Sequence, residues 1–221
     1  MVGLSQRSAN VVPAEIDVLE KTDTLQPANA RGGNWLRQEP TRLCTSGFSV
    51  RTATERGVVT AAHCNGLNKL EEANGALRNM AFRFQVPTYA HGDVEWHALA
   101  NADGLFYGDP NIVYGQNFIR HTNAMEGLTV CAYGRSSNVQ NCNYHIDGVG
   151  ACFLAGAPIN GQVCDVAITT NWGNPALAGD SGGPVFFTDT VFGVLSSSNF
   201  FGMGFTPVEV MQTQLGVLVF N

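Results

Sequence analysis

The sequence predicts an all-β protein, and three features of its composition lead to that expectation. Glycine accounts for 25 of the 221 residues, charged residues make up only 14%, and short runs of Val, Ile, Phe and Thr recur between turn residues. This combination is typical of many short strands rather than long helices. With 44% hydrophobic residues, the chain can bury one substantial core or two small adjoining cores. We therefore expect a β-sandwich or β-barrel.

The expected elements follow from local patterning. Strand signals lie at residues 46–50, 57–60, 80–86, 93–99, 128–133, 162–169, 184–187 and 191–195. A helix is expected over 207–215. A second helix over 70–78 is a weaker alternative, because Gly75 in its middle would cost about 1 kcal/mol. Residues 1–33 have no clear period and are expected to be an N-terminal extension or the remnant of a pro-segment.

Charge and hydropathy exclude two classes of partner. The net charge is -6 and the pI is near 5.2, and the sequence has no run of Lys and Arg that could neutralise several phosphates, so no nucleic-acid partner is expected. No apolar run approaches the ~18 residues that span a bilayer, so no membrane partner is expected either. We expect a monomer.

The six cysteines indicate an oxidising compartment. Their number is even, no CxxC pair is present, and no histidines cluster at the spacing of zinc ligands. Three disulfides are therefore expected rather than a metal site, and with them a secreted protein. The cysteines are Cys44, Cys64, Cys131, Cys142, Cys152 and Cys164.

A candidate nucleophile lies in the hexapeptide Gly-Asp-Ser-Gly-Gly-Pro, residues 179–184. A serine hydroxyl needs an imidazole to take its proton and N–H groups to stabilise the oxyanion that forms. The glycines permit the backbone angles that would turn the N–H groups of Gly179 and Ser181 toward one point. Taken alone, the hexapeptide is equally compatible with an ordinary glycine-rich turn.

A second motif lies upstream, where a strand signal runs into Thr-Ala-Ala-His-Cys at residues 60–64. Together the two motifs resemble the signatures of the chymotrypsin/trypsin-like serine protease family, in that family's His-before-Ser order. The resemblance implies that His63 is general base and then general acid, that Ser181 is the nucleophile, and that no cofactor is needed. It also implies that Cys44 pairs with Cys64 and Cys131 with Cys142, which leaves Cys152 for Cys164.

The family resemblance also implies an architecture. Two adjoining antiparallel β-barrels with a short C-terminal helix are expected. The first barrel would span residues 34–120 and carry His63 and the triad aspartate, and the second would span residues 121–221 and carry Ser181 and the specificity pocket.

Three aspartates compete to be the third member of the triad. Asp93 opens an apparent strand, and its Asp-x-x-Trp-His segment resembles that of some bacterial members. Asp103, followed by glycine, and Asp109, followed by proline, are more typical of turns. We expect Asp93 to be the triad residue and keep Asp103 as the main alternative.

The aspartate before the nucleophile needs a partner. Cys131-Ala-Tyr-Gly-Arg135 is similar to a segment of α-lytic protease and streptogrisin, in which the arginine pairs with the equivalent aspartate. Arg135 is therefore expected to form an ion pair with Asp180. The alternative is a solvated turn arginine.

The specificity pocket can be placed by offset from the nucleophile. In this family the sixth residue before it forms the pocket floor, and here that residue is Pro175, so no carboxylate is available there to attract Lys or Arg. We expect cleavage after a small-to-medium apolar residue of a protein or peptide substrate. The other expected pocket residues are Ala176, Ala178, Ser196, Ser197, Ser198 and Met203.

Three classes of function follow from these residues. A secreted serine endopeptidase is expected first. A catalytically silent binding module that keeps the fold is the main alternative, although such proteins usually lose the Ser or the His. A zinc or calcium protein is a third, but the His and Asp residues are scattered.

Overall fold

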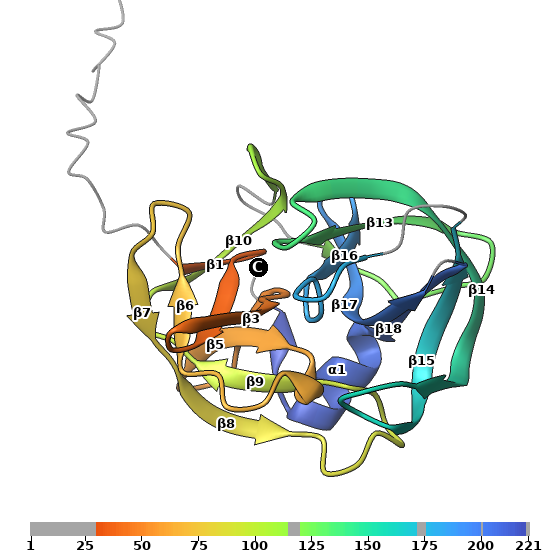
Figure 1. The fold of residues 1–221 in the computed structure, drawn as a ribbon, viewed down its shortest axis with the longest axis horizontal. Helices are drawn as coiled ribbons and strands as arrows, with labels where there is room; N and C mark the ends of the chain where they lie inside the picture. Colours follow the sequence, from red (N-terminus) through yellow and green to blue (C-terminus); the bar gives the residue numbers. More distant parts are fainter. Residues whose placement is uncertain (1–29, 115–119, 172–175, 200, 220–221) are drawn as a thin grey trace, which may run out of the picture.

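Antiparallel strands dominate the structure, as the composition predicts. The computed structural model describes residues 30–114, 120–171, 176–199 and 201–219. Its strands form two groups that lie side by side (Figure 1), one drawn mainly in orange and yellow and the other in green and blue.

Three small sheets form the first group. Their strand orders are β19-β4-β5-β9-β8, β3-β2-β6-β7 and β1-β10-β11. The first strand, β1, lies within the segment expected to be an extension, and it pairs in parallel with β10. The strands are β1 (Ala30–Gly32), β2 (Trp35–Gln38), β3 (Thr41–Thr45), β4 (Ser49–Arg51), β5 (Arg56–Thr60), β6 (Lys69–Glu71), β7 (Leu77–Asn79), β8 (Ala81–Gln85), β9 (Glu95–Ala98), β10 (Ala102–Asp109), β11 (Ile112–Tyr114) and β19 (Leu218–Val219).

One large sheet forms the second group. Its order is β12-β17-β16-β13-β14-β15-β18, and a further pairing of β17 with β18 closes six of these strands into a ring. The strands are β12 (Arg120–His121), β13 (Thr129–Gly134), β14 (Val139–Ala155), β15 (Gly161–Thr170), β16 (Pro184–Phe187), β17 (Thr190–Asn199) and β18 (Gly202–Pro207).

One of the two expected helices is present. Helix α1 (Val208–Leu215) confirms the expectation over 207–215, and it ends at Gly216, whose left-handed φ of 64° makes it a favourable C-cap. The alternative helix over 70–78 is wrong. Strands β6 and β7 form a hairpin there, and Gly75 lies in its turn with a φ of 84°. Among the described residues, no helix has the length and apolar character needed to cross a bilayer.

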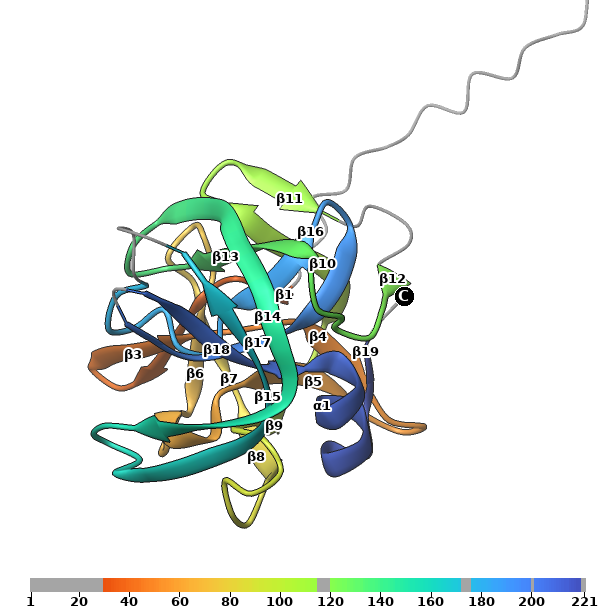
Figure 2. The same cartoon turned by 90° about the vertical axis from the view of Figure 1, so that its right-hand side faces the viewer.

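The two groups share a hydrophobic core. Phe106 packs edge-on against Phe48 of the first group and Phe186 of the second, with ring centroids 4.9 and 5.0 Å apart. Helix α1 adds Val208, Met211 and Leu215 to this core. Figure 2 shows the chain turning back from α1 to β19, which pairs with β4, so the end of the chain ties the second group to the first.

Candidate active site

Strand pairing places His63 and Asp93 at the same end of one sheet. Strands β5 and β9 are antiparallel, with Thr60 opposite Glu95, so the residues after β5 lie next to those before β9. His63 is in the short 3₁₀ helix η1 (Ala62–Cys64). Its Nδ1 lies 2.7 Å from Asp93 Oδ2, and its backbone N–H donates to Asp93 Oδ1 at 3.0 Å. With Nδ1 donating to the carboxylate, Nε2 is the nitrogen that can accept a proton.

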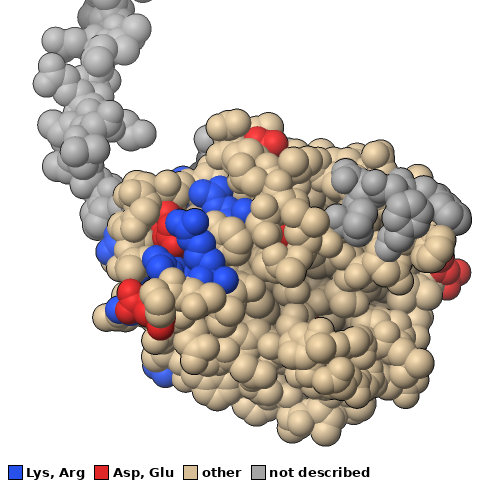
Figure 3. All heavy atoms as spheres, viewed as in Figure 1, with Lys and Arg blue, Asp and Glu red and all other residues tan. Residues whose placement is uncertain are grey.

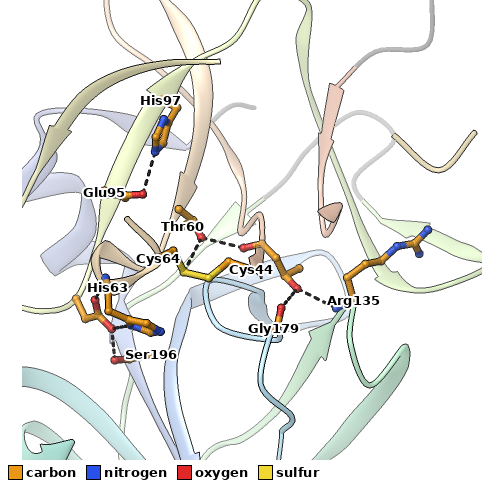
Figure 4. The surroundings of a disulfide bond; sticks show 11 residues. Cys44, Thr60, His63, Cys64, Glu95, His97, Arg135, Gly179 and Ser196 are labelled. Carbon is orange, nitrogen blue, oxygen red and sulfur yellow. Dashed lines mark hydrogen bonds and ion pairs between the residues drawn. A yellow bond between two sulfur atoms is a disulfide. The ribbon is translucent and has the colours of Figure 1, made fainter. Parts of the chain in front are cut away.

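The Asp93 carboxylate is fully buried and has support from the second group of strands. Ser196 Oγ donates to Asp93 Oδ2 at 2.6 Å, and the Asp93 N–H donates to Thr206 Oγ1 at 2.9 Å. Figure 4 shows Ser196 and His63 joined to the same carboxylate. Asp103 lies elsewhere, on β10, and accepts from Arg31 Nε at 3.2 Å.

Ser181 and His63 line one cavity of about 800 Å³ that opens between the two groups of strands. Ser196, which contacts Asp93, lines the same cavity. The structure therefore brings together the three residues that the sequence nominated as a triad.

The peptide units around Ser181 are held by hydrogen bonds on both sides. The Gly179 carbonyl accepts from Thr45 Oγ1 at 2.7 Å, and the next N–H, of Asp180, donates to Leu177 O at 3.0 Å. The Ser181 carbonyl accepts from the Thr45 N–H at 2.9 Å. Within the described residues the N–H groups of Gly179 and Ser181 have no acceptor, so both can serve an incoming oxyanion. Gly179 has a φ of 97°, which a residue with a side chain rarely adopts.

The expected ion pair between Arg135 and Asp180 is not made. The buried Asp180 carboxylate instead accepts from the N–H groups of Ser136 and Ser137, both at 2.9 Å, and of Leu177 at 2.8 Å. The carboxylate lies against Gly134, where a Cβ would come within 2.2 Å of it, so the N–H groups of the following turn reach it directly. Arg135 Nη1 donates instead to Tyr133 Oη at 2.9 Å.

Thr45 is a residue of the site that the sequence analysis missed. Its hydroxyl donates to the Gly179 carbonyl and accepts from the Arg135 N–H at 2.9 Å, and its carbonyl accepts from Thr60 Oγ1 at 2.9 Å. Figure 4 shows these bonds as dashed lines that lead to the labelled Thr60, Gly179 and Arg135. The only sequence signal was its position beside Cys44.

The three expected disulfides are present. They join Cys44 to Cys64, Cys131 to Cys142, and Cys152 to Cys164. The first joins the residue before Thr45 to the residue after His63 and so couples the two. Its sulfurs lie within 4.8 Å of a His63 ring nitrogen, but they are bonded to each other and are therefore not thiolate ligands for a metal.

The third disulfide braces the loop before Asp93. The backbone of Cys164 donates to Tyr89 O at 2.8 Å and accepts from Gly92 N–H at 2.9 Å.

Burial, and after it the negative charges of Asp93 and Glu95, raises the pKa of Tyr89, so its phenol stays protonated.

The expected pocket residues that the structure describes all line the cavity: Ala176, Ala178, Ser196, Ser197, Ser198 and Met203. Pro175 lies outside the described residues. Ser198 Oγ donates to Ala176 O at 2.9 Å and so joins two walls of the cavity. The tip of the β14–β15 hairpin forms a third wall, which the sequence analysis missed, and its Leu154 is 86% exposed.

Comparison with known proteins gives curated relatives, streptogrisin-C among them, and many structural neighbours. No protein-family model matches the chain. Streptogrisin-C of Streptomyces griseus is 24% identical over 179 residues, which is 78% of this chain and 36% of streptogrisin-C, so the chain spans about a third of that relative. Thermobifida fusca protease A aligns with a TM-score of 0.72 at 21% identity over 88% of this chain and 100% of its own. Cellulomonas bogoriensis chymotrypsin aligns with a TM-score of 0.67 at 24% identity over 86% of this chain and 98% of its own.

The chain has the chymotrypsin fold. The expected all-β class and the resemblance to bacterial chymotrypsin-like serine proteases are thereby confirmed. Within this fold the cavity, Ser181 and His63 lie between the two groups of strands, and residues from both groups support Asp93.

Proposed function

We propose that the chain is a secreted serine endopeptidase that acts through Ser181, His63 and Asp93. The observation that carries the proposal is the placement of Ser181 and His63 in one cavity, with the His63 ring fixed by a fully buried carboxylate 2.7 Å away. The similarity to streptogrisin-C supports a hydrolase, and the three disulfides support secretion.

The proposed reaction is acyl transfer to water in two stages. Ser181 Oγ attacks the scissile carbonyl carbon while His63 Nε2 takes its proton, and the N–H groups of Gly179 and Ser181 bind the oxyanion. The tetrahedral intermediate expels the amine, which takes the proton from His63. Water then attacks the acyl-enzyme, gives its proton to His63, and the released Ser181 recovers that proton. Asp93 holds the ring and stabilises its charged form.

The proposed cleavage site follows a small-to-medium apolar residue. The pocket residues that the structure describes include no charged side chain, and the hydrogen bond from Ser198 to Ala176 narrows the space between the two walls. Met203 is buried, lines the same cavity and would limit the depth of the pocket.

Labelling with a fluorophosphonate probe tests the proposal. We expect the folded wild type to be labelled and Ser181→Ala to be unlabelled. Ser181→Ala and His63→Ala should each lower turnover by several orders of magnitude with little change in stability. A folded wild type that neither reacts with the probe nor cleaves a peptide library would instead be the silent binding module. Near-normal turnover by Asp93→Asn would contradict the role of Asp93.

A further inference from the structure

Two arginines bond the carboxylate of Glu71, and a third, Arg135, acts on it through its charge. Nearby lie residues 179–181, which we call the oxyanion loop. Arg37 Nη1 and Arg42 Nε donate to Glu71 Oε2 at 3.2 and 2.9 Å, and Arg42 also reaches Oε1. The hydrogen bond from Arg42, with the charges of Arg42, Arg37 and Arg135, lowers the pKa of Glu71 despite its burial. We call Arg37, Arg42 and Arg135, with Glu71 among them, the arginine cluster.

The arginine cluster is an unusual concentration of positive charge on this protein. Three guanidinium groups against one carboxylate leave two positive charges on a chain whose net charge is -6. Figure 3 shows the Lys and Arg side chains collected on one side of the face, with Asp and Glu side chains among them, while most of the remaining surface there is uncharged. The Arg42 side chain is 52% exposed. Within the described part of the chain, the Arg135 guanidinium bonds only neutral groups, on Tyr133 and Asn138, because Asp180 is bound by backbone N–H groups instead.

Two contacts connect the arginine cluster to the oxyanion loop. Arg42 Cζ lies 5.6 Å from the centroid of the Trp35 ring, and a Cβ built on Gly179 would lie 3.2 Å from Trp35 Cζ3. The Arg135 N–H bonds the same Thr45 hydroxyl that holds the Gly179 carbonyl. The cluster is therefore continuous with the loop that would bind the reacting carbonyl.

The arginine cluster lies where the part of a substrate that follows the scissile bond would pass. If the acyl side of a substrate lies along Ser196–Ser198, the chain must leave Ser181 toward the opposite wall of the cavity. That wall is formed by Leu43 and Cys44 on β3, and Arg42 precedes them on the same strand. An extended chain advances about 3.3 Å per residue, so residues soon after the scissile bond reach the cluster.

We propose that the arginine cluster binds a carboxylate side chain of the substrate within the first few residues after the scissile bond. The inference rests on the proposed endopeptidase function and adds to it a preference for acidic residues on the leaving-group side. A positive surface beside an apolar cavity would also draw acidic segments of unfolded proteins toward the site.

Internally quenched peptides test this preference. All share one acyl-side sequence, chosen from a peptide library, and an amidated C-terminus, and they differ only by Asp or Asn at the first, second or third position after the scissile bond. Mass spectrometry confirms the cleaved bond. We expect kcat/KM to be roughly fivefold higher for Asp at the best position in low salt and the ratio to fall toward one in high salt.

Two charge-matched variants locate the effect. Arg135→Gln should bring the Asp-to-Asn ratio close to one, and its backbone N–H remains to bond Thr45. Arg83 lies on β8 and forms an exposed ion pair with Glu55. Arg83→Gln removes the same charge there and should leave both the Asp-to-Asn ratio and the turnover unchanged. Melting temperatures show that both variants fold.

The outcomes separate this inference from the function it rests on. Cleavage of all peptides with a ratio of one in the wild type overturns the arginine cluster as a binding site and leaves the endopeptidase intact. An unchanged ratio in Arg135→Gln, or an equal loss in Arg83→Gln, also overturns it. Failure of the wild type to cleave any peptide overturns the proposed function and this inference together.

Discussion

Thr45 contacts the turn of residues 179–182, which carries Ser181 and which we call the nucleophile turn, at two points. Its hydroxyl holds the Gly179 carbonyl and its N–H holds the Ser181 carbonyl, at 2.7 and 2.9 Å. These bonds fix the peptide units that follow Gly179 and Ser181, and thereby restrict the adjoining units, whose N–H groups are proposed to bind the oxyanion. Thr45 does not line the cavity and is thus a positioning residue.

Replacing Thr45 by valine removes the hydroxyl and keeps the shape of the side chain. We expect Thr45→Val to lower kcat roughly tenfold, less than the loss of a direct oxyanion donor, with KM changed by less than about twofold. Affinity for a peptide boronic acid, which imitates the tetrahedral intermediate, should fall by a similar factor. Thr45→Ser should restore both. A variant with normal kcat and normal boronic-acid affinity would show that the hydroxyl only supports the fold.

The residues that act through a reactive side chain could be predicted from the sequence. The residues that act through backbone hydrogen bonds could not. His63, Asp93 and Ser181 were nominated by residue type and by family motifs, and the structure brings them together. The Arg135 expectation was wrong because the N–H groups of Ser136, Ser137 and Leu177 hold Asp180, and any residue type other than proline supplies an N–H.

At the scale of elements, α1 carries a carboxylate in a costly position. Glu209 lies in the first turn, where the helix dipole favours a negative charge. Burial nevertheless raises its pKa, and among the described residues its Oε2 is buried without a hydrogen-bond partner. The charged form is therefore less stable in the folded protein than in the unfolded chain.

Glu209→Gln should therefore stabilise the protein in a pH-dependent manner. A raised folded pKa means that wild-type stability falls as pH rises from the ordinary value of 4.5 through the folded pKa. Relative to wild type, the variant should have a higher free energy of unfolding at pH 7 and no gain below pH 4. Urea unfolding of both proteins between pH 4 and pH 7 measures this difference in the free energy of unfolding. Glu126→Gln, on an exposed loop, is the control and should show no such difference.

Local patterning identified strands better than it identified their lengths or turns. Strands β5, β8, β13 and β16 match the predicted segments closely. The hairpin β6–β7 was open to a helical interpretation because its apolar residues are too few to decide the period. Strand β14, with 17 residues, was missed because it is largely exposed and polar along one side, so no apolar run marks it.

At the scale of the whole molecule, the two groups of strands meet at Gly182, where their close approach leaves no room for a side chain. A Cβ on Gly182 would lie 1.9 Å from Thr60 Oγ1 and 2.4 Å from Thr45 O, and the glycine has a φ of 82°. Gly182 belongs to the nucleophile turn, whereas both threonines belong to the first group of strands. The fit between the groups therefore depends on this glycine.

Gly182→Ala should separate the two groups at the active site. We expect a loss of about 3 kcal/mol in the free energy of unfolding, from overpacking and backbone strain together, and a large loss of turnover. Gly161→Ala is the control, because its Cβ would meet only Ile159 O at 3.8 Å. A stable, active Gly182→Ala protein would mean that the junction is more compliant than its contacts indicate.

The assembly of the halves was predictable only through the family motifs. Composition and periodicity indicated many strands, but the parallel pairing of β1 with β10 and the return of β19 to β4 join residues that are far apart in the chain. No local signal specifies such pairings, because they depend on the packing of the completed sheets.

The hydrogen bond from the Thr45 N–H to the Ser181 carbonyl crosses the junction between the groups of strands. Its hydrogen can exchange with solvent only when that junction opens, so the exchange of this single amide measures the free energy of separating the halves. The oxyanion loop loses its support in the same event. Exchange of the Thr45 amide therefore reports the stability of the assembled site against local opening.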